Sequence, residues 1–124
     1  MTDAVVLLAR LLMSAIFIRG GIGKLMAPTA TMGMFRHEHV PVVGAAYAVA
    51  ILVEIGGGVL ALLGWRTRPA ALVLAAWCIA TAATAHWHPD NTAQMTSFMK
   101  NLCMAGGFLL LWAFGPGRFS VDRR

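Results

Sequence analysis

Apolar residues fall into four long runs along the chain, separated by short stretches that contain polar residues, proline or glycine. The runs cover about residues 4–24, 43–64, 69–87 and 97–114. Each is close to the ~20 residues that a helix needs to cross the ~30 Å hydrocarbon core of a bilayer. None shows the alternation over ~10 residues that is typical of a membrane β-strand. The pattern predicts an all-α, transmembrane four-helix bundle with short loops.

Short breaks separate the four runs. Pro28 cannot continue the first helix with full hydrogen bonding, so this helix is expected to end before it. In the stretch 29–39, Met32 and Phe35 can face the acyl boundary, which predicts a short interfacial helix after the first span. The other breaks are a tight connection at 64–69, a loop that opens at 88–91 and a stop at 115–117.

The composition points to a membrane protein. Of the 124 residues, 59% are hydrophobic and 12% are charged, whereas soluble domains average about 45–50% and about 25%. A short chain buries only part of its surface, so one soluble core cannot hide this much hydrocarbon. Disorder, a disulfide scaffold and a multidomain enzyme are excluded by the same composition. We expect one membrane domain over residues 1–124, with the lipid bilayer as its partner.

The first run is predicted to be a retained span and not a signal peptide. It starts Met1-Thr2-Asp3 without a basic segment, and Arg10 and Arg19 interrupt its apolar core. The net charge of +5 is scattered along the chain and forms no dense basic patch, so nucleic acid is not expected as a partner.

The distribution of Lys and Arg predicts the orientation. An even number of spans places both termini and the middle loop on one side of the membrane, and five arginines lie there: Arg66, Arg68, Arg118, Arg123 and Arg124. The other side holds Arg36, with Lys24 and Lys100 at helix ends. The excess predicts cytoplasmic termini in a bacterial inner membrane.

Glu54 lies in the middle of the second run and must be sheltered from lipid. A charged side chain at the centre of a span costs at least ~2.5–3.5 kcal/mol on the insertion scale. Ala46, Ala50 and Gly58 share its helix face, and small residues let a partner helix approach closely. Arg10 lies at a similar depth and is the expected partner of Glu54. Such a pair would either fix the packing of the helices or form part of a binding or proton-handling site.

A cationic outer half is the second candidate site. If Lys24, His86 and Lys100 converge, they form an outward-facing pocket for an anion or a quinone-like head group; otherwise each anchors its helix at the interface. The candidate binding residues are therefore Arg10, Lys24, Glu54, His86, Lys100 and Asn101. The glycines expected to serve close helix packing are Gly21, Gly57, Gly58, Gly106 and Gly107.

Other chemistry has weaker signals. His37/His39 and His86/His88 form two His-x-His pairs, but residues two apart on a helix splay apart, so we expect no metal site. Cys78 and Cys103 lie in apolar runs without a CxxC motif and are interpreted as buried apolar residues. No motif for phosphate binding, acyl transfer or zinc hydrolysis is present.

The order of motifs along the whole chain resembles the DoxX family of small bacterial four-span membrane proteins. These motifs are LLARLLMSAIFIRGGIGKL, VEIGGGVLALLGWRTRPAAL, His86 at the end of the third run, FMKNLCMAGGFLLL and GPGRFSVD. The family is named after a membrane subunit of a thiosulfate:quinone oxidoreductase, and relatives are linked to redox assemblies. Its layout is also similar to quinone-linked disulfide-forming proteins, but this chain lacks their reactive cysteine pair. Arg19 stands where the family would have a small or neutral residue.

The resemblance implies an accessory or quinone-interacting subunit of an oxidoreductase system, with an oxidoreductase subunit or a second copy of the chain as further partners. Quinone is the cofactor it suggests, and no self-contained catalytic constellation is visible. Two other hypotheses stay open: a small-molecule carrier in which Glu54 takes up protons, and a scaffold that holds a soluble partner through Arg66, Arg68 and the basic tail.

Overall fold

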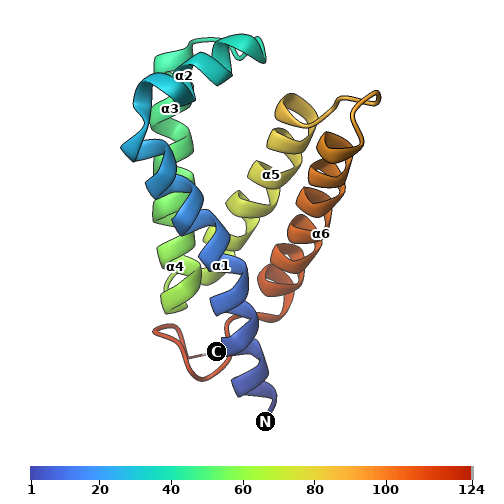
Figure 1. Cartoon of the computed structure of the whole chain (residues 1–124). Coiled ribbons are helices and arrows are strands. Elements are labelled where there is room, and N and C mark those ends of the chain that lie inside the picture. Colours follow the sequence, from blue (N-terminus) through green and yellow to red (C-terminus); the bar gives the residue numbers. More distant parts are fainter. Residues whose placement is uncertain (124) are drawn as a thin grey trace.

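The protein consists of helices joined by short connections. The computed structural model describes residues 1–123, and no strand occurs among them (Figure 1). The elements are α1 (Thr2–Met26), α2 (Pro28–His37), α3 (Val43–Ile51), the π-helical η1 (Leu52–Gly57), α4 (Gly58–Leu63), α5 (Thr67–Ala85) and α6 (Thr92–Phe114). α3, η1 and α4 form one continuous span, so four helices are long and apolar enough to cross a membrane. The predicted all-α four-helix fold is confirmed, including the short helix α2 after the first span.

The helix boundaries differ most from the sequence prediction at the start of the last span. α6 begins at Thr92, five residues before the predicted start at 97, since the polar segment 92–96 is helical too. The Asn91 side chain accepts a hydrogen bond from the backbone N–H of Gln94 and so caps the helix. Hydropathy identifies the part of a helix that suits lipid, whereas a cap identifies where the helix begins.

The spans form two pairs that diverge toward α2. α1 packs on η1 and α4, and α5 packs along α6. α5 also contacts η1 and α4, so the two pairs meet near the chain termini and open toward the other end (Figure 1). We call these the terminal end, where residues 1 and 123 lie, and the α2 end.

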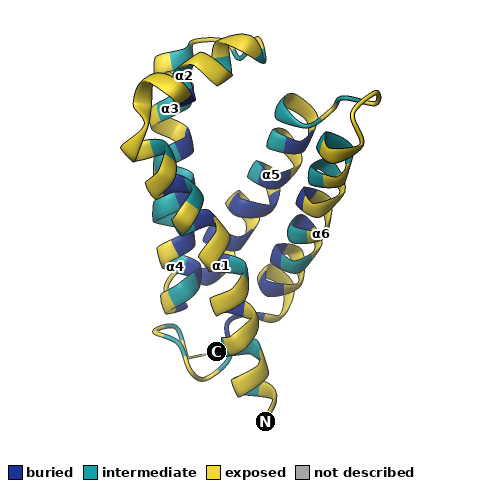
Figure 2. Ribbon diagram, viewed as in Figure 1, coloured by how far each residue is buried: buried dark blue, intermediate teal, exposed yellow. Residues whose placement is uncertain are grey.

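The core lies where the two pairs meet. Phe17 of α1 and Phe108 of α6 are both buried, and their rings make an edge-to-face contact with 5.4 Å between centroids. Leu74 and Cys78 of α5 belong to the same core, whereas Cys103, which was also expected to be buried, is exposed. Many large apolar side chains on the outside are exposed, which suits a surface that faces lipid tails (Figure 2).

Close helix contacts occur at four of the five glycines selected from the sequence. A Cβ added at Gly21 would lie 2.5 Å from Ile55 Cγ1, and one at Gly58 would lie 2.9 Å from Ile18 Cγ1. A Cβ added at Gly57 or at Gly107 would lie 3.0 Å from a neighbouring side chain. Gly106 faces open space, so the expected packing role has no basis in the structure there.

Candidate functional site

The divergence of the two helix pairs leaves a cavity of about 980 Å³ inside the spans. This volume is at the upper end of the roughly 300–1,000 Å³ that ligand pockets occupy. Most of its wall is apolar: Ile16 and Phe17 from α1, Ala45, Ala46 and Val49 from α3, and Ala80 and Ala83 from α5. The cavity therefore suits a lipophilic molecule.

A polar cluster lies in this apolar wall. Lys24 Nζ lies 3.0 Å from Glu54 Oε2 and donates a hydrogen bond to Oε1 at 3.1 Å. Trp77 Nε1 also donates to Glu54 Oε1, at 3.3 Å. Glu54 is only 7% exposed, so these two donors compensate a charge that would otherwise be costly in hydrocarbon. Asn101, which is also buried, contributes to the same cavity.

Local backbone geometry positions the carboxylate. Glu54 belongs to the π-helical turn η1, in which one residue more than in an α-helix occupies the turn. Such turns are rare and occur frequently at functional sites. Tyr47 Oη of α3 donates to the Lys24 carbonyl of α1 at 2.9 Å, which ties the end of α1 to α3. The two partners of the ion pair are thus held by separate spans.

The predicted Arg10–Glu54 pair is wrong. The Arg10 guanidinium is buried at the terminal end, where it donates to the carbonyls of Pro116 at 3.3 Å and Phe119 at 2.6 Å. Residues 115–123 fold back against the bundle and bring these acceptors. The prediction compared only the depths of Arg10 and Glu54 along straight helices. It could not include the C-terminal segment that folds back onto Arg10, or the length of the Lys24 side chain, which reaches Glu54.

The structure brings together four of the six residues predicted to bind a ligand. Lys24, Glu54, His86 and Asn101 line the cavity, and His86 Nδ1 lies 2.8 Å from Gln94 Oε1. Lys100 is exposed on α6 and does not line the cavity. Its neighbour Asn101 does, because successive residues point about 100° apart on a helix. The convergence of Lys24, His86 and Lys100, one of the two alternatives considered from the sequence, is therefore not found.

Two functional candidates were not selected from the sequence, Trp77 and Glu38. Tryptophan usually marks membrane interfaces, but Trp77 lies in the middle of its span, where its N–H needs an acceptor. That position was the available signal. For Glu38, nothing in the sequence indicated contact with the distant α5–α6 loop.

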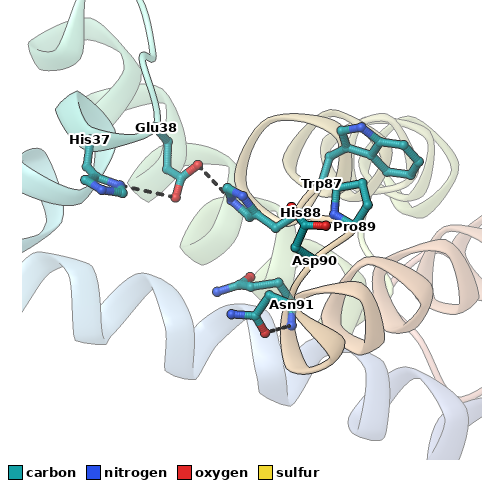
Figure 3. Close-up of a pocket in the computed structure, with 8 residues that line it drawn as sticks. His37, Glu38, Trp87, His88, Pro89, Asp90 and Asn91 are labelled. Carbon is teal, nitrogen blue, oxygen red and sulfur yellow. Dashed lines mark hydrogen bonds and ion pairs between the residues drawn. The ribbon is translucent and has the colours of Figure 1, made fainter.

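Glu38 forms a contact across the open end of the helix pairs. His88 Nε2 lies 3.2 Å from Glu38 Oε2, and His37 Nδ1 lies 3.7 Å from Glu38 Oε1 (Figure 3). A second pocket of about 430 Å³ surrounds this cluster. Within residues 1–123, no three His, Cys, Asp or Glu side chains are grouped as metal ligands, and His39 joins no such group.

These features define a multi-pass helical membrane protein with a cavity between its spans. Comparison with known proteins gives the family: the DoxX model matches residues 5–87, and the chain belongs to the DoxX family. It is 40% identical to Inner membrane protein YqjF of Escherichia coli K12, over 98% of this chain and 92% of that protein. It is 35% identical to Inner membrane protein YphA of the same organism, over 95% and 88%. No solved structure matches the chain significantly.

Proposed function

We propose that this inner-membrane protein binds a quinone-like molecule in its intramembrane cavity, as an accessory subunit of an oxidoreductase system. The observation that carries the proposal is the combination of an apolar cavity with two side chains that can donate N–H groups to a ligand, Lys24 and Asn101. A lipophilic ligand that accepts hydrogen bonds fits this combination.

The chemistry of a quinone matches these groups. Its ring has two carbonyl oxygens, which accept hydrogen bonds, and its hydrocarbon tail needs an apolar surrounding. Asn101 can donate through its amide, and Lys24 has donors beyond those that its contacts with Glu54 use. Glu54 would orient Lys24 and leave the ligand as a further acceptor for the ammonium group, whereas the single N–H of Trp77 is used by Glu54 itself.

The redox setting is supported by family resemblance alone. The name-giving DoxX-type subunit accompanies an oxidoreductase, and this chain would supply a quinone site while a partner subunit carries out electron transfer. We further propose that the termini are cytoplasmic, since five arginines lie at the terminal side in the sequence. The α2 end then faces outward.

Titration of purified protein in detergent with a short-tailed ubiquinone analogue tests the proposal. The measurement is equilibrium binding, with Lys24→Met and Asn101→Leu as variants, each of which removes an N–H donor but keeps a side chain of similar size. We expect about five- to tenfold weaker binding for each, because a hydrogen bond contributes about 1 kcal/mol.

Arg19→Gln is the matched control, since Arg19 is exposed on α1 and does not line the cavity. Its affinity should equal that of the unmodified protein. Absence of binding by the unmodified protein, or equal affinity of all four proteins, would contradict a quinone site in this cavity.

A further inference from the structure

The carboxylate of Glu38 stands between two spaces. It lines the large cavity between the spans and also the smaller pocket around the α5–α6 loop. Gln94 is shared by both spaces as well, whereas Lys24 and Glu54 belong to the large cavity alone. Glu38 is therefore placed where one space leads to the other.

A side-chain contact is what joins the two helix pairs at this point. α2 packs on α1 and α3, whereas within residues 1–123 no more than a weak backbone contact joins α2 to α5 or α6. The contact between Glu38 Oε2 and His88 Nε2 at 3.2 Å spans that opening (Figure 3). The two residues lie 50 positions apart in the chain. Breaking this contact would therefore let the two helix pairs move apart without breaking a helix.

The Glu38 carboxylate is better shielded from water than either histidine that contacts it. The Glu38 side chain is 17% exposed and that of His88 40%, whereas His37 is 84% exposed. Since His37 also lies farther from the carboxylate, at 3.7 Å, His88 is the stronger partner. Imidazole is the side chain that ordinarily changes its charge between about pH 5 and 8.

We propose that the Glu38–His88 contact is a pH-dependent gate between the aqueous surface and the intramembrane cavity. With His88 protonated, the ion pair holds the two helix pairs together and restricts entry of molecules from water into the cavity. With His88 neutral, the attraction between opposite charges is lost, and the two helix pairs separate more often at the α2 end. The inference rests on the presence of the cavity and not on the identity of its ligand.

Other titratable groups surround this contact. His37 and Asp90 line the smaller pocket with Glu38, and His39 and His86 line the large cavity beside it. The inner end of that cavity holds Lys24 and Glu54, which neutralise each other. Among these groups, only His37 and His88 contact the Glu38 carboxylate within 4.0 Å, so His88 and His37 are the ones to vary.

Modification of a cavity cysteine by a permanently charged, water-soluble thiosulfonate tests the gate, because this reagent cannot enter through lipid. The full-length protein with Cys78→Ser and Cys103→Ser carries one new cysteine, Ala46→Cys, at a residue that lines the cavity. Rates are divided by those of Thr92→Cys, an exposed position, to remove the effect of pH on the thiol.

We expect Glu38→Gln and His88→Gln to raise the normalised rate about fivefold at pH 5.5, as for loss of an ion pair near a surface. Without these changes, the rate should rise between pH 5.5 and 8, and His37→Gln should keep most of that rise. Ala15→Cys, on the lipid-facing side of α1, should stay unlabelled throughout.

Equal normalised modification rates at pH 5.5 in the protein that keeps Glu38 and His88 and in both Gln variants would overturn the gate. A rise with pH that persists in His88→Gln would overturn the role of His88. Because no ligand is present, failure here is distinct from a failure of quinone binding, and a thermal melt shows that each variant is folded.

Discussion

Two cations on α1 are accommodated in different ways, and both depend on partners from elsewhere in the chain. Lys24 pairs with a carboxylate, so the two charges cancel inside the span. Arg10 instead donates to the backbone carbonyls of Pro116 and Phe119, which supply partial negative charge. Arg19 is exposed and has no hydrogen-bond or ion-pair partner among residues 1–123, and its side chain is long enough to extend toward the membrane surface.

Gly21 provides a residue-scale prediction, since it lies against the backbone and side chain of Ile55. Gly21→Ala should lower the free energy of unfolding by about 1–3 kcal/mol, the usual cost of overpacking. Gly23→Ala is the control: nothing lies within 4 Å of its added Cβ, and alanine favours the helix by up to about 1 kcal/mol. Denaturation in a fixed detergent compares the two; equal stability of both variants would show that α1 and η1 are not in close contact.

Much of the site at this scale followed from the sequence. Charged residues in apolar runs are visible without a structure, and Lys24 and Glu54 were both selected. The partner of Glu54 was not predictable from depth alone, because a lysine side chain spans more than a helical turn and can reach a carboxylate well below its own Cα. Trp77 was missed although its position in the middle of a span, away from the interfaces where tryptophan is enriched, was a signal in the sequence.

At the scale of elements, the C-terminal segment closes the terminal end. The Asp122 carboxylate accepts hydrogen bonds from the N–H groups of Arg66 and Thr67 and from Thr67 Oγ1. It thereby caps the start of α5 from a distant part of the chain, where helix N–H groups lack partners. Asp3 likewise accepts from the N–H of Arg118. Sequence patterns place caps next to their helices, so this arrangement could not be predicted.

Asp122→Ala should therefore loosen the segment. We expect a loss of about 1–2 kcal/mol in unfolding free energy, as for other helix caps, and faster proteolysis within residues 115–123. Asp90→Ala, which removes an exposed loop carboxylate, is the control and should change neither. Unaltered protease sensitivity of Asp122→Ala would argue that the segment is held without this cap.

For the whole molecule, the pattern of exposed apolar residues requires lipid as the solvent. This property was predictable from composition, since the number and length of the runs define four spans. The divergence of the helix pairs was not, because hydrophobic runs say little about how far apart two helices pack. The small residues of α3 and α5 permit close packing, yet here they line a cavity.

Orientation is tested on intact cells with a membrane-impermeant maleimide. In a Cys78→Ser and Cys103→Ser background, Val121→Cys lies at the terminal end and Thr92→Cys at the α2 end, both at exposed positions. Cytoplasmic termini predict labelling of the Thr92 variant in intact cells and of both variants after lysis. Labelling of the Val121 variant alone in intact cells would reverse the assignment.

Lys24 and Glu54 form the charged centre of the cavity, and a double-mutant cycle measures the coupling between them. Lys24→Met, Glu54→Gln and the double variant are compared by free energy of unfolding in one detergent, beside a second cycle that pairs Arg10→Met with Glu54→Gln. We expect a coupling of about 0.5–3 kcal/mol for Lys24 with Glu54, and additive effects for Arg10 with Glu54. Additivity in the first cycle with coupling in the second would contradict it.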